Sequence, residues 1–252
     1  MTGSPSAAPS AAPSAAAPSA APSPASSPAR PRSRRERPAK PALSHRAIVA
    51  AAVRILEAEG LQRVTMRRLA QDLDTGPASL YVYVANTADL HAAILEEYLG
   101  QVDLGPVTAA GDWRERLALV LDSCTAVLFR HPALAHAALV ARPSGPHYLA
   151  LVEALLTLLH EGGVPDAQAA WGVDVLLLTA TATAAEQSAR DADPTAEAEH
   201  HALGEALRAA PAATHPRIAA LGDDLVSGAP EDRLAWMFRV VVNGTLATPR
   251  PS

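Results

Sequence analysis

Apolar residues recur at three- and four-residue spacing over most of the chain after residue 43. The first run, HRAIVAAAVRILEAE, places Ile48, Ile55 and Leu56 on one helical face. Ser44 is suited to cap the start of this helix and Gly60 to end it. No segment sustains the alternation at a period of two that is typical of a strand. The pattern therefore predicts an all-α fold.

Three shorter helices follow, and the pattern places them over residues 66–73, 77–84 and 87–102. Residues suited to helix starts precede or begin them: Thr65, Pro77, and Asn86 or Thr87. The turn between the second and third helices is the tight stretch Asp74–Pro77. Two short helices joined by a tight turn and preceded by a longer helix are the layout of a helix-turn-helix.

Local breaks at prolines or paired glycines divide the rest of the chain. Seven further helices are predicted near residues 112–130, 133–141, 146–161, 166–190, 195–208, 215–226 and 230–247. Residues 1–42 are a low-complexity tract of alanine, proline and serine with too few bulky apolar residues to fold. The chain thus divides into a disordered basic arm (1–42), a helix-turn-helix domain (43–103) and a helical C-terminal domain (104–252).

Charge is distributed unevenly along the 252 residues, although the net charge is only −5. Residues 1–43 carry six basic groups and one acid. Residues 44–103 carry five basic groups and eight acids, and residues 104–252 carry ten basic groups and seventeen acids. The basic groups of the arm are Arg30, Arg32, Arg34, Arg35, Arg37 and Lys40. We expect this arm to follow a nucleic-acid backbone or enter its minor groove; a solubilising tail is the alternative.

The amino-acid composition narrows the classes of protein to which the chain can belong. Apolar residues make up 49% of the chain but aromatic residues only 4%, which indicates a core of alanine, leucine and valine. The single cysteine, Cys124, lies mid-helix and is interpreted as a small buried hydrophobe rather than a redox sensor. No metal-ligand spacing, glycine-rich phosphate loop or nucleophile elbow occurs. We therefore expect that the protein is not an enzyme and that it binds no metal or cofactor. Because the sequence shows no signal peptide and no membrane span, we also expect a cytoplasmic protein.

The predicted third helix, PASLYVYV, has two faces. Leu80 and Val84 stand at i and i+4 and are expected to pack against the core. The outward face then carries valine and tyrosine, which suit contacts to thymine methyl groups and to phosphates.

Taken together, the stretches Thr65–Leu73 and Leu80–Asn86, followed by Leu90, resemble the DNA-binding domain of the TetR family. The resemblance covers about residues 44–103 and departs from the family pattern at three positions. Tyr83 replaces the usual histidine, Thr87 replaces a lysine, and Asp74, which tolerates a left-handed conformation, replaces the turn glycine.

The resemblance implies DNA contacts from both helices of the motif, with Arg67 in a base-contacting position. The residues selected for DNA are Thr65, Arg67, Pro77, Ala78, Ser79, Tyr81, Val82, Tyr83 and Thr87. It also implies a homodimer, and hence a near-palindromic operator, with two recognition helices about one DNA turn apart. Long apolar helices at 166–190 and 230–247 suit the dimer seam.

The resemblance further implies a small effector bound by the C-terminal domain, which makes a repressor released by its ligand the predicted function. A lining of alanine, leucine and valine, with Thr179, Thr181 and Thr183 on one helix, favours a mostly apolar effector with a few hydroxyl contacts. The residues selected as effector contacts are Trp171, Thr179 and Thr183. Such threonines equally suit hydrogen bonds to the preceding turn of their own helix. The stretch GQVDLGPV lacks the histidine of tetracycline-binding members. The alternative is a regulator that acts through a protein partner and has no small-molecule effector.

Overall fold

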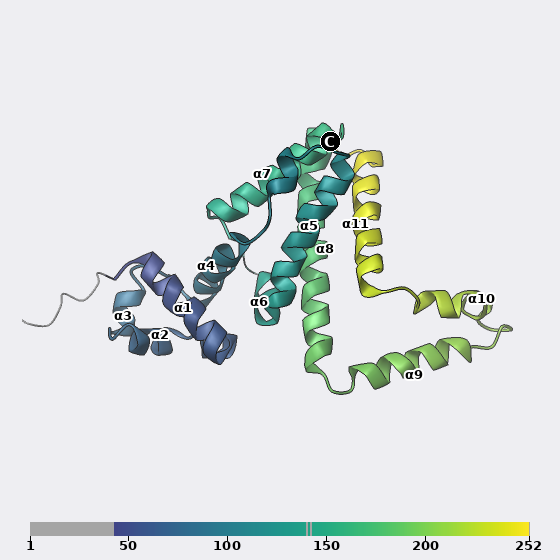
Figure 1. The fold of residues 1–252 in the computed structure, drawn as a ribbon. Helices are drawn as coiled ribbons and strands as arrows, with labels where there is room; N and C mark the ends of the chain where they lie inside the picture. Colours follow the sequence, from purple (N-terminus) through teal and green to yellow (C-terminus); the bar gives the residue numbers. More distant parts are fainter. Residues whose placement is uncertain (1–42, 140, 142, 252) are drawn as a thin grey trace, which may run out of the picture. The chain divides into compact units, whose positions relative to one another are not determined.

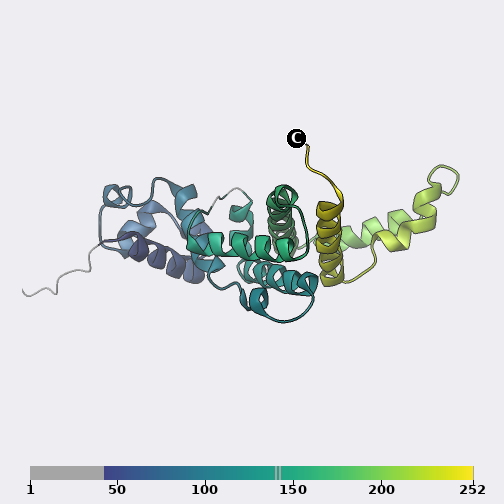
Figure 2. The same cartoon turned by 90° about the horizontal axis from the view of Figure 1, so that it is seen from above.

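The computed structural model describes residues 43–139, 141 and 143–251. The predicted arm, with its six basic residues, lies outside the described residues. All regular elements in the described ranges are helices, which confirms the predicted all-α class (Figures 1 and 2). The α-helices are α1 (His45–Glu59), α2 (Met66–Asp72), α3 (Pro77–Leu80), α4 (Thr87–Leu99), α5 (Trp113–Arg130), α6 (Pro132–Ala138), α7 (Pro146–Glu161), α8 (Asp166–Ala192), α9 (Ala196–Arg208), α10 (Pro216–Leu225) and α11 (Pro230–Ala247).

Helices α1 to α4 begin where capping chemistry predicts, and α1 also ends there, whereas α4 ends at Leu99 rather than at residue 102. The hydroxyl of Ser44 accepts a hydrogen bond from the Ala47 backbone N–H at 3.2 Å, and Gly60 ends α1 at φ 85°. Thr65 caps α2, and Asn86 rather than Thr87 caps α4, where its side chain accepts from the Asp89 N–H at 2.9 Å. Each cap satisfies a backbone donor that the helix itself leaves unpaired.

The turn between α2 and α3 depends on Asp74, which has φ 47°. This left-handed conformation is the one predicted for the residue that replaces the turn glycine, and Asp adopts it more readily than most residues do. The turn directs the chain from α2 into α3 within four residues.

The 27-residue helix α8 is the central element of the C-terminal part and packs against α5, α6, α7 and α11 (Figure 1). Small residues allow α11 to approach closely: a Cβ on Gly172 would lie 2.6 Å from Thr245 Cγ2. Gln168 Nε2 also donates to the Thr245 carbonyl at 2.8 Å. Helices α9 and α10 pack chiefly against each other. The core is built mainly from leucine, alanine and valine, as the composition indicates.

Helix α4 packs on both sides of the predicted boundary at residues 103 and 104, because it contacts α1 as well as α5, α6 and α7. Tyr98 is the centre of these contacts. Its hydroxyl donates to Glu57 of α1 at 3.2 Å, and its ring lies 3.9 Å from the His131 ring, centroid to centroid. Burial, reinforced by Glu57, raises the pKa of Tyr98 to about 12, so the phenol remains a neutral donor.

Two histidines in this region predict a pH-dependent stability. Burial lowers the pKa of His91, and burial with the neighbouring Arg130 lowers the pKa of His131. Unfolding restores ordinary values near 6.5, so below that pH the unfolded chain binds more protons. We expect the free energy of unfolding to fall as the pH decreases through 6.5. Denaturant titrations at pH 7.5 and 5.5 would measure this fall.

The control for this prediction is the exposed His200, whose replacement by glutamine should leave the pH dependence unchanged. His91→Gln and His131→Gln should each reduce it. An identical pH dependence in all three variants and the parent protein would contradict the assignment.

No single helix among the described residues is long and apolar enough to cross a bilayer. Helices α5 and α6 would be long and apolar enough only if they were counted together, and the chain bends by 114° between them.

Candidate nucleic-acid interface and regulatory cavity

Helix α2 is fixed by its cap and by its buried face. Thr65 Oγ1 accepts from the Arg68 N–H at 3.1 Å, while Met66, Leu69 and Ala70 are buried. Arg67 lies on the opposite, exposed face, and within the described ranges it has no acidic partner. Its guanidinium is therefore available to a ligand outside the chain.

The segment predicted as the third helix is helical only from Pro77 to Leu80 and continues as a turn over residues 81–83. The prediction of a helix to residue 84 was too long. The backbone tightens after Leu80, whose carbonyl accepts from the N–H groups of both Tyr83 (2.9 Å) and Val84 (3.0 Å). Leu80 (0% exposed) and Val84 (1%) are buried, as their i and i+4 positions predict.

The residues predicted to face outward in this segment all do so. Val82 is 79% exposed, Tyr81 54% and Tyr83 39%, and Pro77, Ala78 and Ser79 are exposed as well. Neither tyrosine hydroxyl has a hydrogen-bond partner in the part of the chain that the structure describes. An apolar side chain flanked by two free phenols suits the methyl groups and phosphates of a DNA groove.

Two of the five arginines in residues 44–103 are committed to ion pairs. Arg54 pairs with Asp72 at 2.9 Å, and Arg68 pairs with Glu59 at 2.5 Å and lies 3.8 Å from Asp72. The Arg68 guanidinium lowers the pKa of Glu59, which keeps that carboxylate charged. The domain therefore presents fewer free cations than its composition indicates. Thr87, which replaces the family's lysine, is exposed at the first position of α4.

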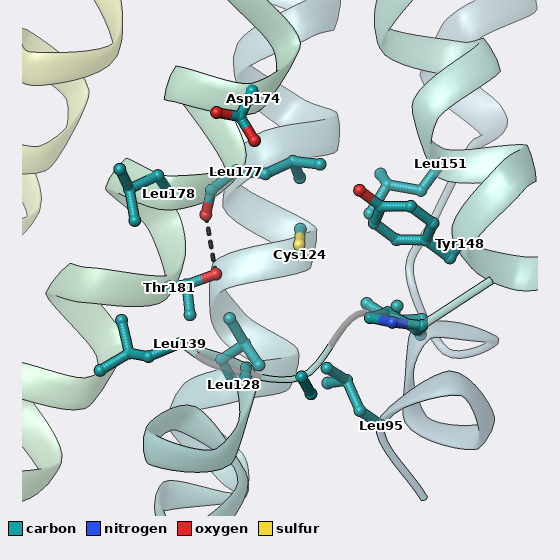
Figure 3. Close-up of a pocket in the computed structure, with 14 residues that line it drawn as sticks. Leu95, Cys124, Leu128, Leu139, Tyr148, Leu151, Asp174, Leu177, Leu178 and Thr181 are labelled. Carbon is teal, nitrogen blue, oxygen red and sulfur yellow. Dashed lines mark hydrogen bonds between the residues drawn. The ribbon is translucent and has the colours of Figure 1, made fainter. Parts of the chain in front are cut away.

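A cavity lies between α4, α5, α6, α7 and α8 (Figure 3). It encloses about 160 Å³ and opens beside the exposed side chains of Leu139, Asp174 and Leu178. Its lining residues in the described ranges are Leu95, Leu99, Cys124, Leu128, Ala138, Leu139, Ala141, Pro143, Tyr148, Leu151, Asp174, Leu177, Leu178 and Thr181. Cys124 is 3% exposed and burial raises its pKa to about 12, which confirms the interpretation as a buried hydrophobe.

The residues predicted to contact an effector do not line this cavity: Trp171, Thr179 and Thr183 are absent from its walls. The reason is helical geometry, because successive residues turn by about 100° and Thr181 therefore points away from Thr179 and Thr183. Thr181 lines the cavity instead. Thr179 and Thr181 donate to the carbonyls of Val175 (2.8 Å) and Leu177 (2.7 Å), so the alternative interpretation of hydrogen bonds within the helix holds for both.

Helix α4 links this cavity to the helix-turn-helix. Leu95 and Leu99 form part of the wall, and between them Glu96 caps the start of α7. The Glu96 carboxylate accepts from the backbone N–H groups of His147 (2.6 Å) and Tyr148 (3.2 Å). A Cβ on Gly145 would collide with the Glu96 side chain, so only glycine fits there without rearrangement. Sequence reasoning missed this contact, because its partners lie 51 and 52 residues apart.

Helices α8 and α11 share an exposed apolar face. Trp171, Val175 and Leu178 follow one another at i, i+4 and i+7 on α8, and Trp236 and Val240 at i and i+4 on α11. Trp171 and Trp236 are 56% and 59% exposed. The Arg250 guanidinium lies 4.9 Å from the Trp171 ring centroid, and Asp232, Arg233 and Arg239 lie near Trp236. Large exposed tryptophans with a rim of charged residues are typical of a surface that a partner covers.

A helix-turn-helix with an exposed third-helix segment, followed by a larger helical domain, defines the class of a helix-turn-helix transcriptional regulator. The family model "Bacterial regulatory proteins, tetR family" matches residues 48–94, and "Tetracyclin repressor-like, C-terminal domain" matches residues 105–244. The chain therefore belongs to the TetR family, as its motifs indicated. Proteins of this family are DNA-binding transcription factors rather than enzymes.

The chain is 34% identical over 133 residues to the HTH-type transcriptional repressor DrrR1 of Streptomyces coeruleorubidus, covering 53% of this chain and 49% of that protein. It thus spans about half the length of the curated relatives it matches. Among solved structures, SCO7704 of Streptomyces coelicolor is 60% identical, covers 84% of this chain and 99% of its own, and has a TM-score of 0.72.

A second solved structure, ActR of Streptomyces coelicolor in complex with actinorhodin, is 34% identical. It covers 81% of this chain and 96% of its own, with a TM-score of 0.72.

Proposed function

We propose that this protein is a homodimeric transcriptional repressor that binds a near-palindromic DNA operator and releases it when a small, mostly apolar effector enters the cavity. The observation that carries the proposal is the exposed segment Pro77–Tyr83 held on a helix-turn-helix by the buried Leu80 and Val84. Arg67 and the Thr65 cap extend this surface along α2. Binding to chromosomal DNA requires a cytoplasmic protein.

Dimerisation follows from the exposed apolar face of α8 and α11. Two such faces packed about a two-fold axis form a four-helix seam and cover Trp171 and Trp236 of both copies. The same axis relates two recognition segments, which fit half-sites separated by about 34 Å, one turn of DNA.

The cavity supports an effector that is largely hydrophobic. Eleven of its fourteen described lining residues are Leu, Ala, Pro or Cys, and the polar ones are Tyr148, Asp174 and Thr181. ActR, which shares the fold, has been solved with actinorhodin, a further argument for a small-molecule effector. An effector against Tyr148 displaces the start of α7, and Glu96 passes that displacement to α4 and so to the helix-turn-helix.

The arm is proposed to supply positive charge that the folded domain lacks. Arg54 and Arg68 are committed to acids, whereas residues 30–40 carry six basic groups. Cations that neutralise phosphates make affinity depend steeply on salt.

Selection of bound sequences from random double-stranded DNA tests the proposal, using the full chain and a variant without residues 1–42. We expect both proteins to enrich one near-palindromic sequence. The shortened variant should bind it more weakly and with a shallower dependence on salt, by about one unit of logarithmic slope per lost phosphate contact. Failure of the full chain to enrich any sequence would overturn the function, and equal salt slopes would overturn the role of the arm.

A further inference from the structure

We infer that the effector of this protein carries a positive charge on an apolar body, and that Asp174 is the counter-ion for it. This inference rests on the proposed function, because it names the chemical class of ligand for the same cavity. It starts from the polar side chains that line the cavity, which are Asp174, Thr181 and Tyr148.

Asp174 is the one charged residue among the described lining residues, and it projects from α8 at the exposed rim of the cavity (Figure 3). Within residues 43–139, 141 and 143–251 its carboxylate has no hydrogen-bond donor and no basic partner. By contrast, Arg54, Arg68, Arg116 and Arg190 all pair with acids elsewhere in those ranges. Among the described residues, no positive charge compensates that of Asp174 at the cavity.

The second polar side chain on α8, Thr181, offers only an acceptor to the cavity. The Thr181 hydroxyl donates its proton to the Leu177 carbonyl at 2.7 Å, so only its lone pairs remain for a ligand. Asp174 and Thr181 project from α8, and Tyr148 stands across the cavity on α7 (Figure 3). A ligand that complements α8 thus carries donors and positive charge on one side and hydrocarbon on the other.

The net charge of the C-terminal domain also favours a positively charged ligand. Residues 104–252 carry seventeen acids and ten basic groups, so the domain attracts cations over a distance. A neutral apolar ligand would leave the Asp174 carboxylate partly desolvated without a partner, which costs affinity. An ammonium or amidinium group replaces the lost water with a charge-assisted contact.

A pair of probes of the same shape tests the inference: benzyltrimethylammonium and its uncharged carbon isostere, neopentylbenzene. Binding to the full-length protein is measured by calorimetry and by the shift in melting temperature. Because the trimethylammonium group has no N–H, its preference depends on Coulomb attraction to the carboxylate. We expect the cation to bind at least about tenfold more tightly than the isostere, and Asp174→Asn to remove that preference. Glu153→Gln, which removes an exposed carboxylate outside the cavity, should leave both affinities unchanged.

Arg142 lies outside the described residues and is adjacent in sequence to the lining residues Ala141 and Pro143, so Arg142→Gln is measured in parallel. The preference for the cation should persist in that variant. Equal affinity for the two probes, or a preference that survives Asp174→Asn, would overturn the inference. Operator binding by the same preparations is measured separately, so a failed inference is distinguished from a failed assignment as a DNA-binding repressor.

Discussion

Replacing Trp236 by glutamate is expected to convert the dimer into a monomer and to abolish operator binding. Trp236 is 59% exposed in the single chain and stands beside Val240 on the apolar face that α11 shares with α8. In a symmetric dimer the change occurs twice, and each copy loses a buried aromatic side chain and gains an unpaired carboxylate. Tryptophan at such positions contributes about 2 kcal/mol or more per copy.

The expected loss is therefore at least about 4 kcal/mol, which raises the dimer dissociation constant about a thousandfold. Analytical ultracentrifugation measures the mass, and gel shift with the selected operator should show affinity reduced at least about a hundredfold, since a monomer occupies a single half-site. The matched control is Leu149→Glu on α7, where the leucine is also 59% exposed but lies outside α8 and α11. A dimeric Trp236→Glu protein would refute the proposed seam.

Leu80→Ala is expected to reduce the stability of the protein, whereas Val82→Ala, two residues further along the chain, is expected to reduce DNA binding without reducing stability. Leu80 is fully buried, so its truncation leaves a cavity beneath the recognition segment and lowers the free energy of unfolding by about 2–5 kcal/mol. Val82 is 79% exposed, and its truncation should change stability by no more than about 0.5 kcal/mol. Urea denaturation measures both effects.

The effect of Val82→Ala on operator affinity should be larger than its effect on stability. Val82→Ala removes apolar surface expected to contact a base, with a loss of about tenfold in affinity at unchanged stability. Tyr148→Phe, which changes a residue of the cavity and not of the motif, is the control and should retain operator affinity. If Val82→Ala binds the operator as the parent protein does, the exposed face of this segment is not the one that contacts DNA.

Sequence reasoning succeeded where the determining contacts are local. Helix starts at Ser44 and Thr65 depend on a side chain and a backbone group three residues apart, and the left-handed Asp74 on its own backbone. Leu80 and Val84 were predicted as buried from spacing alone. The end of α3 was misplaced because the tightened turn after Leu80 is decided by packing, which a periodic pattern does not record.

The cavity could not be predicted for a related reason. Its walls come from five helices, α4 to α8, and from the segment after α6. Which face of α8 contributes depends on how that helix is rotated against α5 and α11. A pattern of threonines every second residue, at 179, 181 and 183, contains no information on that rotation, and the prediction selected the members that face elsewhere. The contact of Glu96 with the start of α7 is equally non-local.

Helix α4 is shared by the core of the helix-turn-helix and by the wall of the cavity, and its carboxylate at Glu96 holds α7 in place. If the position of α4 that binds the operator differs from the position that binds the effector, then operator DNA and effector compete although they do not contact each other. Thermodynamic reciprocity then requires that DNA expel the effector by the same factor by which the effector expels DNA. Operator sites in excess would therefore raise the effector concentration needed for induction, so the number of sites in the cell would itself set the threshold of the response.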